Sequence, residues 1–254
     1  MKRAEASARF IELIRKPERL IRLDLGALLI AAHAYPDLEV DRELARLDDL
    51  ATRCRTPTLD ALVMHLFVVE RFVGNRSDYY DPRNSFLNDV LDRRRGIPIT
   101  LSLLTIEVGR RIGVPLSGVG MPGHFLLRDK VDRSVFVDPF SGGATLTAEQ
   151  CEAVFRRLAG PETPFDPAYL EPAGARSILA RLLANLKAVY RERGDRRALL
   201  WVLRLRAAIP GVPATELREL AMMLAASGRF DAAADTLEGL EEPEAATRLR
   251  ARLN

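Results

Sequence analysis

Hydrophobic and polar residues follow two different periods along this chain. Apolar residues recur at steps of three and four up to about residue 75 and again from residue 176 onward, which predicts helices at both ends. The clearest N-terminal stripe lies in a helix predicted over Thr58–Val73 and consists of Leu59, Leu62, Val63, Leu66, Val69 and Val73. A helix predicted over Pro98–Ile112 is apolar on most sides, so we expect it to be central and buried. Proline suits its first turn, because the N–H that it lacks would have no partner there.

The period changes to that of strands after this helix. Segments rich in β-branched and aromatic residues predict three short strands: Leu116–Gly120, His124–Arg128 and Ser134–Asp138. The last two form a predicted hairpin centred near Val131. A symmetric register pairs Arg128 with Ser134 and His124 with Asp138, and opposed side chains have Cβ atoms about 4.5–5.5 Å apart. The pattern therefore predicts a hydrogen bond between the His124 imidazole and the Asp138 carboxylate.

Local signals place the remaining boundaries. The loop-forming residues of 74–83 precede a short helix predicted over Phe86–Arg94, with Asn84 or Ser85 as its cap. Thr147 and Gln150 form a capping-box pattern that opens a helix to about Leu158. The predicted fold class is α+β, mostly helical, with a small antiparallel sheet.

The C-terminal third carries a weak repeat. A spacing of 34 residues separates Gly194 from Gly228 and Ala198 from Ala232, which resembles tetratricopeptide repeats, although only about two units fit. The Pro-rich segment before it is aperiodic and is the best candidate boundary. We expect a first domain over 1–160, a connecting segment over 161–174 and a tetratricopeptide-like helical region over 175–254.

Composition restricts the function classes. The 254 residues are 48% hydrophobic and 29% charged, and 38 basic residues against 35 acidic ones give a formal charge of +3. The signs are interspersed, so a nucleic-acid groove is disfavoured. No apolar run has the length of a membrane span, and the N-terminus lacks the apolar core of a signal peptide, which predicts a cytoplasmic protein without a membrane partner. Cys54 and Cys151 lack metal-ligand or CxxC spacing and are predicted to be free thiols.

The predicted His124–Asp138 pair has the chemistry of a base and its orienting carboxylate. In such an arrangement the carboxylate fixes the imidazole tautomer and stabilises its charged form. A nucleophile would complete the site, ideally at a helix N-terminus, where the helix dipole lowers the pKa of a thiol. The helix start predicted beside the sheet is Gly96–Pro98.

Five short motifs resemble one known family: Tyr80–Pro82, Asn84–Asn88, Arg94–Ile99, Pro122–Leu126 and Asp138–Phe140. They look like those of the SirB-type bacterial transglutaminase-like proteins, which carry tetratricopeptide-like C-terminal helices. The resemblance implies a papain/transglutaminase-like core. It also implies that the family's catalytic His and Asp correspond to His124 and Asp138, and that the family's nucleophilic Cys corresponds to Pro98.

The resemblance favours a protein that has lost catalysis. Pro98 has no nucleophilic atom, and Cys54 and Cys151 lie more than 40 residues away in sequence. Thr100 and Ser102 would offer hydroxyl nucleophiles only after a shift along the helix, and capping or backbone bonding is their expected role. We therefore expect a non-catalytic protein that binds or scaffolds a protein or peptide and needs no cofactor.

Alternatives remain open at this stage. His124 can act as a general base on water in a hydrolase or acyl-transfer enzyme, with Asp138 orienting it, or the pair can be a structural hydrogen bond. Asn84, Ser85 and Asn88 can bind substrate or can tie the preceding loop to the core. Asp81 can join the pair around a metal ion, although no ligand spacing supports that and we expect no metal site. Partner recognition can also lie entirely in the C-terminal helices, and the oligomeric state is not specified.

Overall fold

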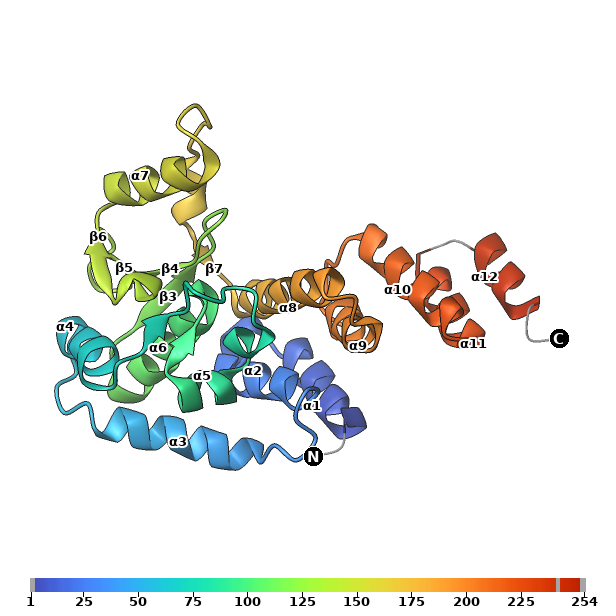
Figure 1. The fold of residues 1–254 in the computed structure, drawn as a ribbon, viewed down its shortest axis with the longest axis horizontal. Helices are drawn as coiled ribbons and strands as arrows, with labels where there is room; N and C mark the ends of the chain where they lie inside the picture. The colour runs from blue at the N-terminus through green and yellow to red at the C-terminus, as the bar shows by residue number, and fades with distance from the viewer. Residues whose placement is uncertain (1–2, 241–242, 252–254) are drawn as a thin grey trace.

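The computed structural model describes residues 3–240 and 243–251, and it confirms a mostly helical α+β fold with a small antiparallel sheet (Figure 1). The chain begins with α1 (Arg3–Arg15), the 3-10 turn η1 (Glu18–Leu20), α2 (Leu23–Ala31) and α3 (Val40–Thr52). Asp24 of α2 and Asp41 of α3 each lie inside the first turn of their helix. None of the helices in the described ranges is long and apolar enough to span a membrane.

The helix predicted over Thr58–Val73 is shorter than expected. Thr58 caps α4 (Leu59–Val63) by accepting the Ala61 N–H, and a π-helical segment, η2 (Met64–Val69), follows. Arg71 has a φ of 59°, in the left-handed region, which ends the helical path. Val73 then enters β1 (Val73–Gly74), and its side chain is exposed instead of continuing the buried stripe.

The central helix forms where the sequence places it. The turn η3 (Pro82–Ser85) and α5 (Leu87–Arg93) precede β2 (Arg95–Gly96), and α6 runs over Pro98–Ile112. The cap of α5 is Phe86, so neither Asn84 nor Ser85 caps it. Strands β1 and β2 form a parallel pair that the sequence did not predict, because two-residue strands have no periodicity.

Five antiparallel strands form the main sheet in the order β6–β5–β4–β3–β7. Their bounds are β3 Leu116–Val119, β4 Leu126–Asp129, β5 Phe136–Asp138, β6 Ala144–Leu146 and β7 Pro172–Ala173. The predicted register is wrong by two residues, since Arg128 pairs with Phe136 rather than with Ser134. The connecting turn is asymmetric, because the carboxylates of Asp129 and Asp132 accept the backbone N–H groups of Val131 and Ser134. A shift of two residues keeps every side chain on its predicted face.

Helices cover both faces of this sheet. α6 packs on β3 and β4 from one side, and its burial extends from Pro98 to Gly109. On the other side, α7 (Ala148–Ala159) begins with the predicted Thr147–Gln150 capping box and is followed by η5 (Pro167–Leu170). A second apolar cluster lies there: Val119, Met121, Leu126, Phe136, Cys151, Phe155 and Leu170.

The C-terminal helices are α8 (Ala175–Glu192), α9 (Arg196–Ala207), α10 (Ala214–Ala226), α11 (Phe230–Glu238) and α12 (Pro243–Arg250). α8 packs on α2 and α6, and its apolar residues join the core of the N-terminal helices. A Cβ at Gly26 would lie 2.6 Å from Leu179 Cδ1, so glycine permits this close approach of α2 and α8. Figure 1 shows α10–α12 extending away from the sheet.

Candidate active site

A cavity of about 600 Å³ opens beside the sheet where five segments meet. The loop 75–81, the first residue of α6, the turn before β4, the end of β5 with the 3-10 turn η4 (Pro139–Ser141), and α7 all contribute to its wall. The residues that line it are Arg76, Tyr79, Tyr80, Pro98, Gly123, His124, Asp138, Phe140, Ser141, Val154, Arg157 and Leu158. The structure thus brings Pro98, His124 and Asp138 to one cavity.

His124 and Asp138 are in direct contact and are both buried. Nε2 of His124 lies 3.0 Å from Oδ2 of Asp138. This is an ion-pair distance, but Nε2 does not have the alignment of a hydrogen bond. The other carboxylate oxygen, Oδ1, accepts the backbone N–H groups of Phe140 and Ser141. Burial raises the pKa of Asp138, but the His124 contact and the Ser141 bonds outweigh it, and the net pKa lies below the usual value.

His124 is held in position by a tight turn and by an arginine from a C-terminal helix. The His124 N–H donates to Met121 O across a turn in which Gly123 has a φ of 74°, a conformation that favours glycine. Arg181 of α8 donates from one guanidinium nitrogen to Met121 O at 2.8 Å and to His124 O at 2.6 Å. The Phe140 ring contacts the imidazole edge to face at 6.3 Å. Nδ1 has no hydrogen-bond partner among the described residues, and His124 is one of the residues that line the cavity.

Pro98 occupies the start of α6 at the cavity wall. The helix is fastened at this end by the Thr100 hydroxyl, whose Oγ1 accepts the Ile97 N–H at 3.1 Å and donates to Asn84 O at 2.7 Å. The positive end of the α6 dipole lies at this position. The start of α6 is therefore suited to an anionic nucleophile. The Pro98 side chain at this position, however, is a saturated ring.

The other nucleophile candidates do not reach the cavity. Thr100 is committed to the bonds above, and Ser102 is fully buried with no partner for its hydroxyl among the described residues. Cys151 is buried in the apolar cluster behind the sheet. Burial and the negative charges of Asp138 and Glu149 raise the pKa of its thiol to about 12, so the thiol stays protonated.

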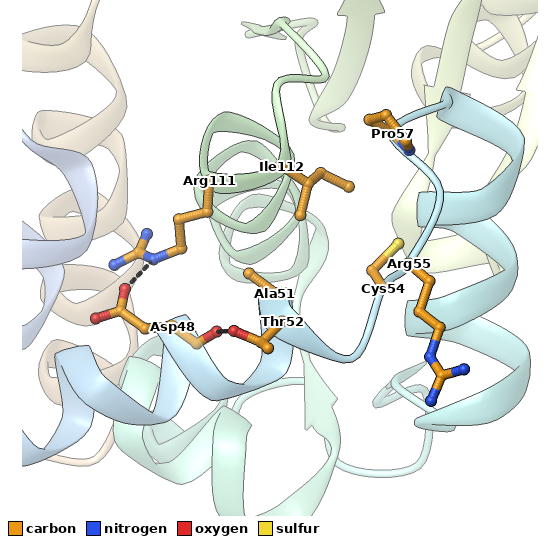
Figure 2. Close-up of a pocket in the computed structure, with 8 residues that line it drawn as sticks. All are labelled: Asp48, Ala51, Thr52, Cys54, Arg55, Pro57, Arg111 and Ile112. Atoms are coloured by element: carbon orange, nitrogen blue, oxygen red, sulfur yellow. Dashed lines mark hydrogen bonds and ion pairs between the residues drawn. The ribbon is translucent and has the colours of Figure 1, made fainter.

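Cys54 lies in a different cavity of about 560 Å³, between the ends of α3 and α6 (Figure 2). Its Sγ donates to Thr56 O at 3.7 Å, and burial raises the pKa of the thiol. Arg55 and Arg111 also line this cavity, but no histidine does. A lone protonated thiol without a base has no nucleophilic role there.

The cavity wall does not include Asn84, Ser85 or Asn88. Asn84 is fully buried: its Nδ2 donates to Asp78 O and Tyr79 O, and its Oδ1 accepts from Asn75 Nδ2 at 2.9 Å. Ser85 and Asn88 are buried as well, and none of the three lines the cavity. Asn84 therefore holds the loop that carries Tyr79 and Tyr80 in place.

Asp81 is separated from the His124–Asp138 pair by its own partners. Its carboxylate contacts Arg83 at 2.8 Å and Arg93 at 3.2 Å, and after the opposing effect of burial these arginines lower its pKa. Within the described ranges, no group of three or more His, Cys, Asp or Glu side chains is arranged to hold a metal ion.

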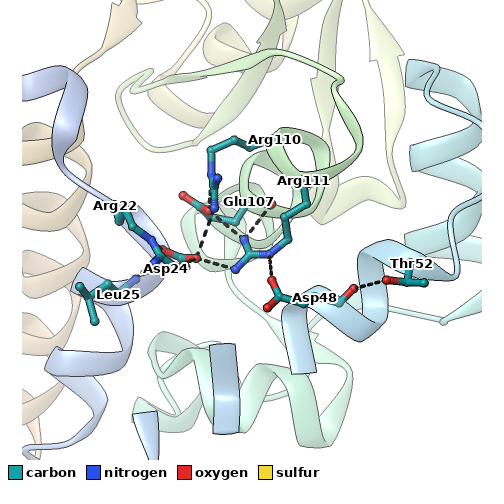
Figure 3. A network of polar contacts seen from close by, with 8 residues as sticks. All are labelled: Arg22, Asp24, Leu25, Asp48, Thr52, Glu107, Arg110 and Arg111. Atoms are coloured by element: carbon teal, nitrogen blue, oxygen red, sulfur yellow. Dashed lines mark hydrogen bonds and ion pairs between the residues drawn. The ribbon is translucent and has the colours of Figure 1, made fainter. Parts of the chain in front are cut away.

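A buried charge network at the far end of α6 was not predicted from the sequence (Figure 3). Arg111 contacts Asp24 at 2.7 Å, Asp48 at 2.6 Å and Glu107 at 3.0 Å, and it connects α6 to α2 and α3. Burial and the Asp24 charge raise the pKa of Glu107. Hydrogen bonds from Arg22 and Arg111 outweigh burial at Asp24 and lower its pKa. This network fixes the helix whose opposite end carries Pro98.

The cavity and its fold define a transglutaminase-like protein, and comparison with known proteins agrees. The family model for the transglutaminase-like superfamily matches residues 34–184, so the chain belongs to that superfamily. The match extends through the 161–174 segment into α8.

Bacterial relatives cover a larger part of the chain. A UPF0162 protein of Xylella fastidiosa is 43% identical over 187 residues, which are 68% of this chain and 66% of the relative. A UPF0162 protein of Pseudomonas aeruginosa is 32% identical over 184 residues, 69% of this chain and 67% of that protein. Human F-box only protein 21 is 35% identical over 150 residues, which are 55% of this chain but 23% of that protein. The match to the Xylella protein thus spans just under two thirds of its length, and no solved structure matches the chain.

Proposed function

We propose that this chain is a non-catalytic, SirB-type transglutaminase-like protein that uses the cavity around His124 to bind a protein or peptide. The observation that carries the proposal is Pro98 at the start of α6, in the wall of the cavity that His124 and Asp138 also line. Covalent acyl transfer needs an atom that attacks the substrate carbonyl and is then displaced. The proline ring contains carbon atoms and an amide nitrogen, and neither kind of atom can attack a substrate carbonyl and then be displaced.

The same geometry supports retention of the cavity for binding. Asp138 keeps its position through two backbone N–H groups, and Asn84 holds the loop that forms part of the cavity wall. A cavity of about 600 Å³ lies in the size range of ligand-binding sites, about 300–1,000 Å³.

The C-terminal helices provide a second candidate surface. The 34-residue spacing supports a tetratricopeptide-like arrangement, and α10–α12 enclose an apolar groove of about 430 Å³ that includes the exposed Met222. Partner binding at this groove rather than at the His124 cavity is the alternative location.

A catalytic alternative has one observation in its favour. Nδ1 of His124 lacks a hydrogen-bond partner among the described residues, while Nε2 contacts the Asp138 carboxylate. An imidazole held this way can take a proton from water and activate it without a covalent intermediate. Under this alternative the protein is a hydrolase or acyl-transfer enzyme.

Two experiments test these proposals. Amine incorporation into glutamine peptides and peptidase and amidase turnover are measured for the wild-type protein and for His124→Ala. We expect no turnover from either; turnover that His124→Ala abolishes would establish the catalytic alternative. Affinity capture then compares wild type with Tyr80→Ala in the cavity and Met222→Glu in the groove. A partner lost only with Tyr80→Ala is held by the cavity, and one lost only with Met222→Glu is held by the helices.

A further inference from the structure

The cavity wall carries arginines that lack acidic partners. Arg76 and Arg157 both line the cavity and are exposed, and no carboxylate of the described residues lies within ion-pair distance of either. Arg76 donates to the Ser141 hydroxyl at 3.4 Å and its guanidinium lies over the Phe140 ring at 4.8 Å from the centroid. These contacts orient its charge at the rim without neutralising it.

Several arginines elsewhere in the fold are paired with carboxylates, and the two in the cavity wall are not. Arg111, Arg206 and Arg176, for example, each contact at least one carboxylate. A third cation, Arg181, lies beneath the His124 turn and donates only to carbonyl groups, and burial lowers its pKa. Arg76 and Arg157 therefore add positive charge to the cavity wall that no carboxylate of the described residues neutralises.

The cavity has little negative charge of its own. Asp138 is the only carboxylate in its wall, and all of its oxygens are in use: Oδ1 accepts two backbone N–H groups, and Oδ2 faces His124. The charge that remains in the cavity is positive. An occupant with negative charge completes it, because opposite charges in a partly enclosed site attract more strongly than in water.

Apart from His124 and Ser141, the rest of the wall is mostly apolar and aromatic. Tyr80 is 59% exposed and Leu158 is 53% exposed, although both are large apolar side chains. Tyr79 bridges Tyr80 and Phe140 through edge-to-face contacts at 5.4 and 5.9 Å. Exposed aromatic rings beside arginines are typical of surfaces that bind polypeptides.

We propose that the cavity binds an acidic peptide segment, with aspartate or glutamate carboxylates at Arg76 and Arg157 and apolar side chains against Tyr79, Tyr80 and Leu158. This inference rests on the proposed binding function and names the chemical class of its partner. A peptide fits better than a nucleic acid, because two rim arginines are too few to follow a phosphate backbone and the chain as a whole carries only a small net charge of +3.

The test uses the full-length protein and fluorescein-labelled peptides that differ only in charge. The acidic probe is Glu-Glu-Leu-Phe-Glu-Glu-Leu; glutamine and lysine replace every glutamate in two matched peptides, and oligo-dT serves as the nucleic-acid probe. We expect the acidic peptide to bind at least about tenfold more tightly than the glutamine peptide, with affinity that falls as salt rises. Equal binding of the glutamine or lysine peptide, or stronger binding of oligo-dT, would overturn the proposal.

Variants locate the binding. Arg76→Gln and Arg157→Gln are each expected to weaken the acidic peptide about three- to fivefold, as partly exposed charge pairs do, and the glutamine peptide hardly at all. Arg197→Gln makes the same change at an exposed position of α9 outside the cavity, and its affinity should stay at the wild-type value. If Arg197→Gln lowered the affinity for the acidic peptide as much as Arg76→Gln and Arg157→Gln do, the attraction would be nonspecific and the proposal would be overturned.

Mass spectrometry of the recovered peptide separates this inference from the proposed function. A bound acidic peptide that returns unchanged supports both. An acidic peptide that binds selectively and returns hydrolysed or amine-modified supports the partner class and refutes the non-catalytic function. Unchanged peptides with no charge preference refute the partner class and leave the non-catalytic function standing.

Discussion

His124 and Asp138 meet across a diagonal of the β4–β5 hairpin rather than across one rung. Arg128 pairs with Phe136, so the two residues are offset by two positions from direct opposition, yet Nε2 and Oδ2 lie 3.0 Å apart. Diagonal neighbours on one face of a sheet are about 7–8 Å apart at Cα, which a histidine and an aspartate can bridge. The contact therefore depends on both side chains sharing a face.

Replacing Asp138 tests how much of the local structure depends on its charge. Asp138→Asn keeps an oxygen for the backbone N–H groups of Phe140 and Ser141 but removes the negative charge beside His124. We expect the free energy of unfolding at pH 7 to fall by about 1–3 kcal/mol. Urea denaturation followed by circular dichroism measures it.

The Asp138→Asn variant also tests how the free energy of unfolding depends on pH. The native pKa of Asp138 lies below its usual value, so the unfolded chain binds more protons and the wild type loses stability as pH falls below about 4. Asp138→Asn should lack this component, so its stability deficit relative to wild type should shrink as pH drops from 5 to about 2.5. A constant difference across that range would mean that the pKa of Asp138 is the same in the native and unfolded states.

Introducing a thiol at position 98 tests whether the start of α6 is a nucleophile position. Pro98→Cys places a thiol at the N-terminus of α6, in the cavity that His124 lines, where the helix dipole and a nearby imidazolium lower a thiol pKa. We expect this variant to gain one site that iodoacetamide alkylates at pH 6.5 at least about tenfold faster than Cys54 or Cys151. Peptide mapping by mass spectrometry assigns each rate.

Two controls accompany this variant. Pro98→Ala should gain no reactive site, and the double variant Pro98→Cys with His124→Ala should alkylate more slowly than Pro98→Cys alone. A thiol at position 98 that reacts no faster than the buried cysteines would show that the start of α6 is not the nucleophile position.

The parts of the site that were predicted from the sequence depend on local signals. Pro98 marks the start of α6 because proline and the preceding glycine act on their immediate neighbours. The His124–Asp138 contact was predicted because the face of a strand residue depends only on parity. The exact register was wrong, because two aspartate side chains reshape the hairpin turn.

The remaining parts depend on packing between distant segments. Arg76 and Tyr80 come from a loop, and Arg157 and Leu158 come from α7, so their convergence on one cavity has no signature in any single stretch. The main partners of Arg110 and Arg111 are carboxylates of α2, α3 and α6, and no single stretch of sequence indicates that these helices meet.

The buried charge network gives a stability prediction with an adjacent control. Arg111→Met removes the more buried of the two arginines that contact both Asp24 and Glu107, and we expect a loss of about 3–5 kcal/mol in the free energy of unfolding. Arg110→Met removes the neighbouring arginine, whose side chain is 53% exposed against 9% for Arg111, and should cost less than about 1 kcal/mol. Guanidinium denaturation of both variants checks this, and equal losses would contradict it.

His33 gives a prediction for the pH dependence of stability between the N-terminal and C-terminal helices. Its Nδ1 lies 2.9 Å from Leu29 O, its Nε2 lies 2.8 Å from the Ser7 hydroxyl, and its ring stacks on Trp201 of α9. With a carbonyl as the only possible partner, Nδ1 donates, so Nε2 of the neutral ring accepts from Ser7. Burial lowers the pKa of this imidazole, so the buried ring resists protonation.

The direction of the pH dependence follows from the difference between the pKa of His33 in the native state and its pKa in the unfolded state. Below the unfolded pKa of about 6.5 the unfolded chain takes up a proton that the native His33 refuses, so the stability contribution of His33 is complete above that pH and falls as pH decreases toward the native pKa. His33→Gln removes the titration. We expect urea denaturation at pH 7.5 and pH 5.5 to show a larger loss of stability on acidification for wild type than for His33→Gln. Parallel losses in the two proteins would mean that the pKa of His33 is the same in the native and unfolded states.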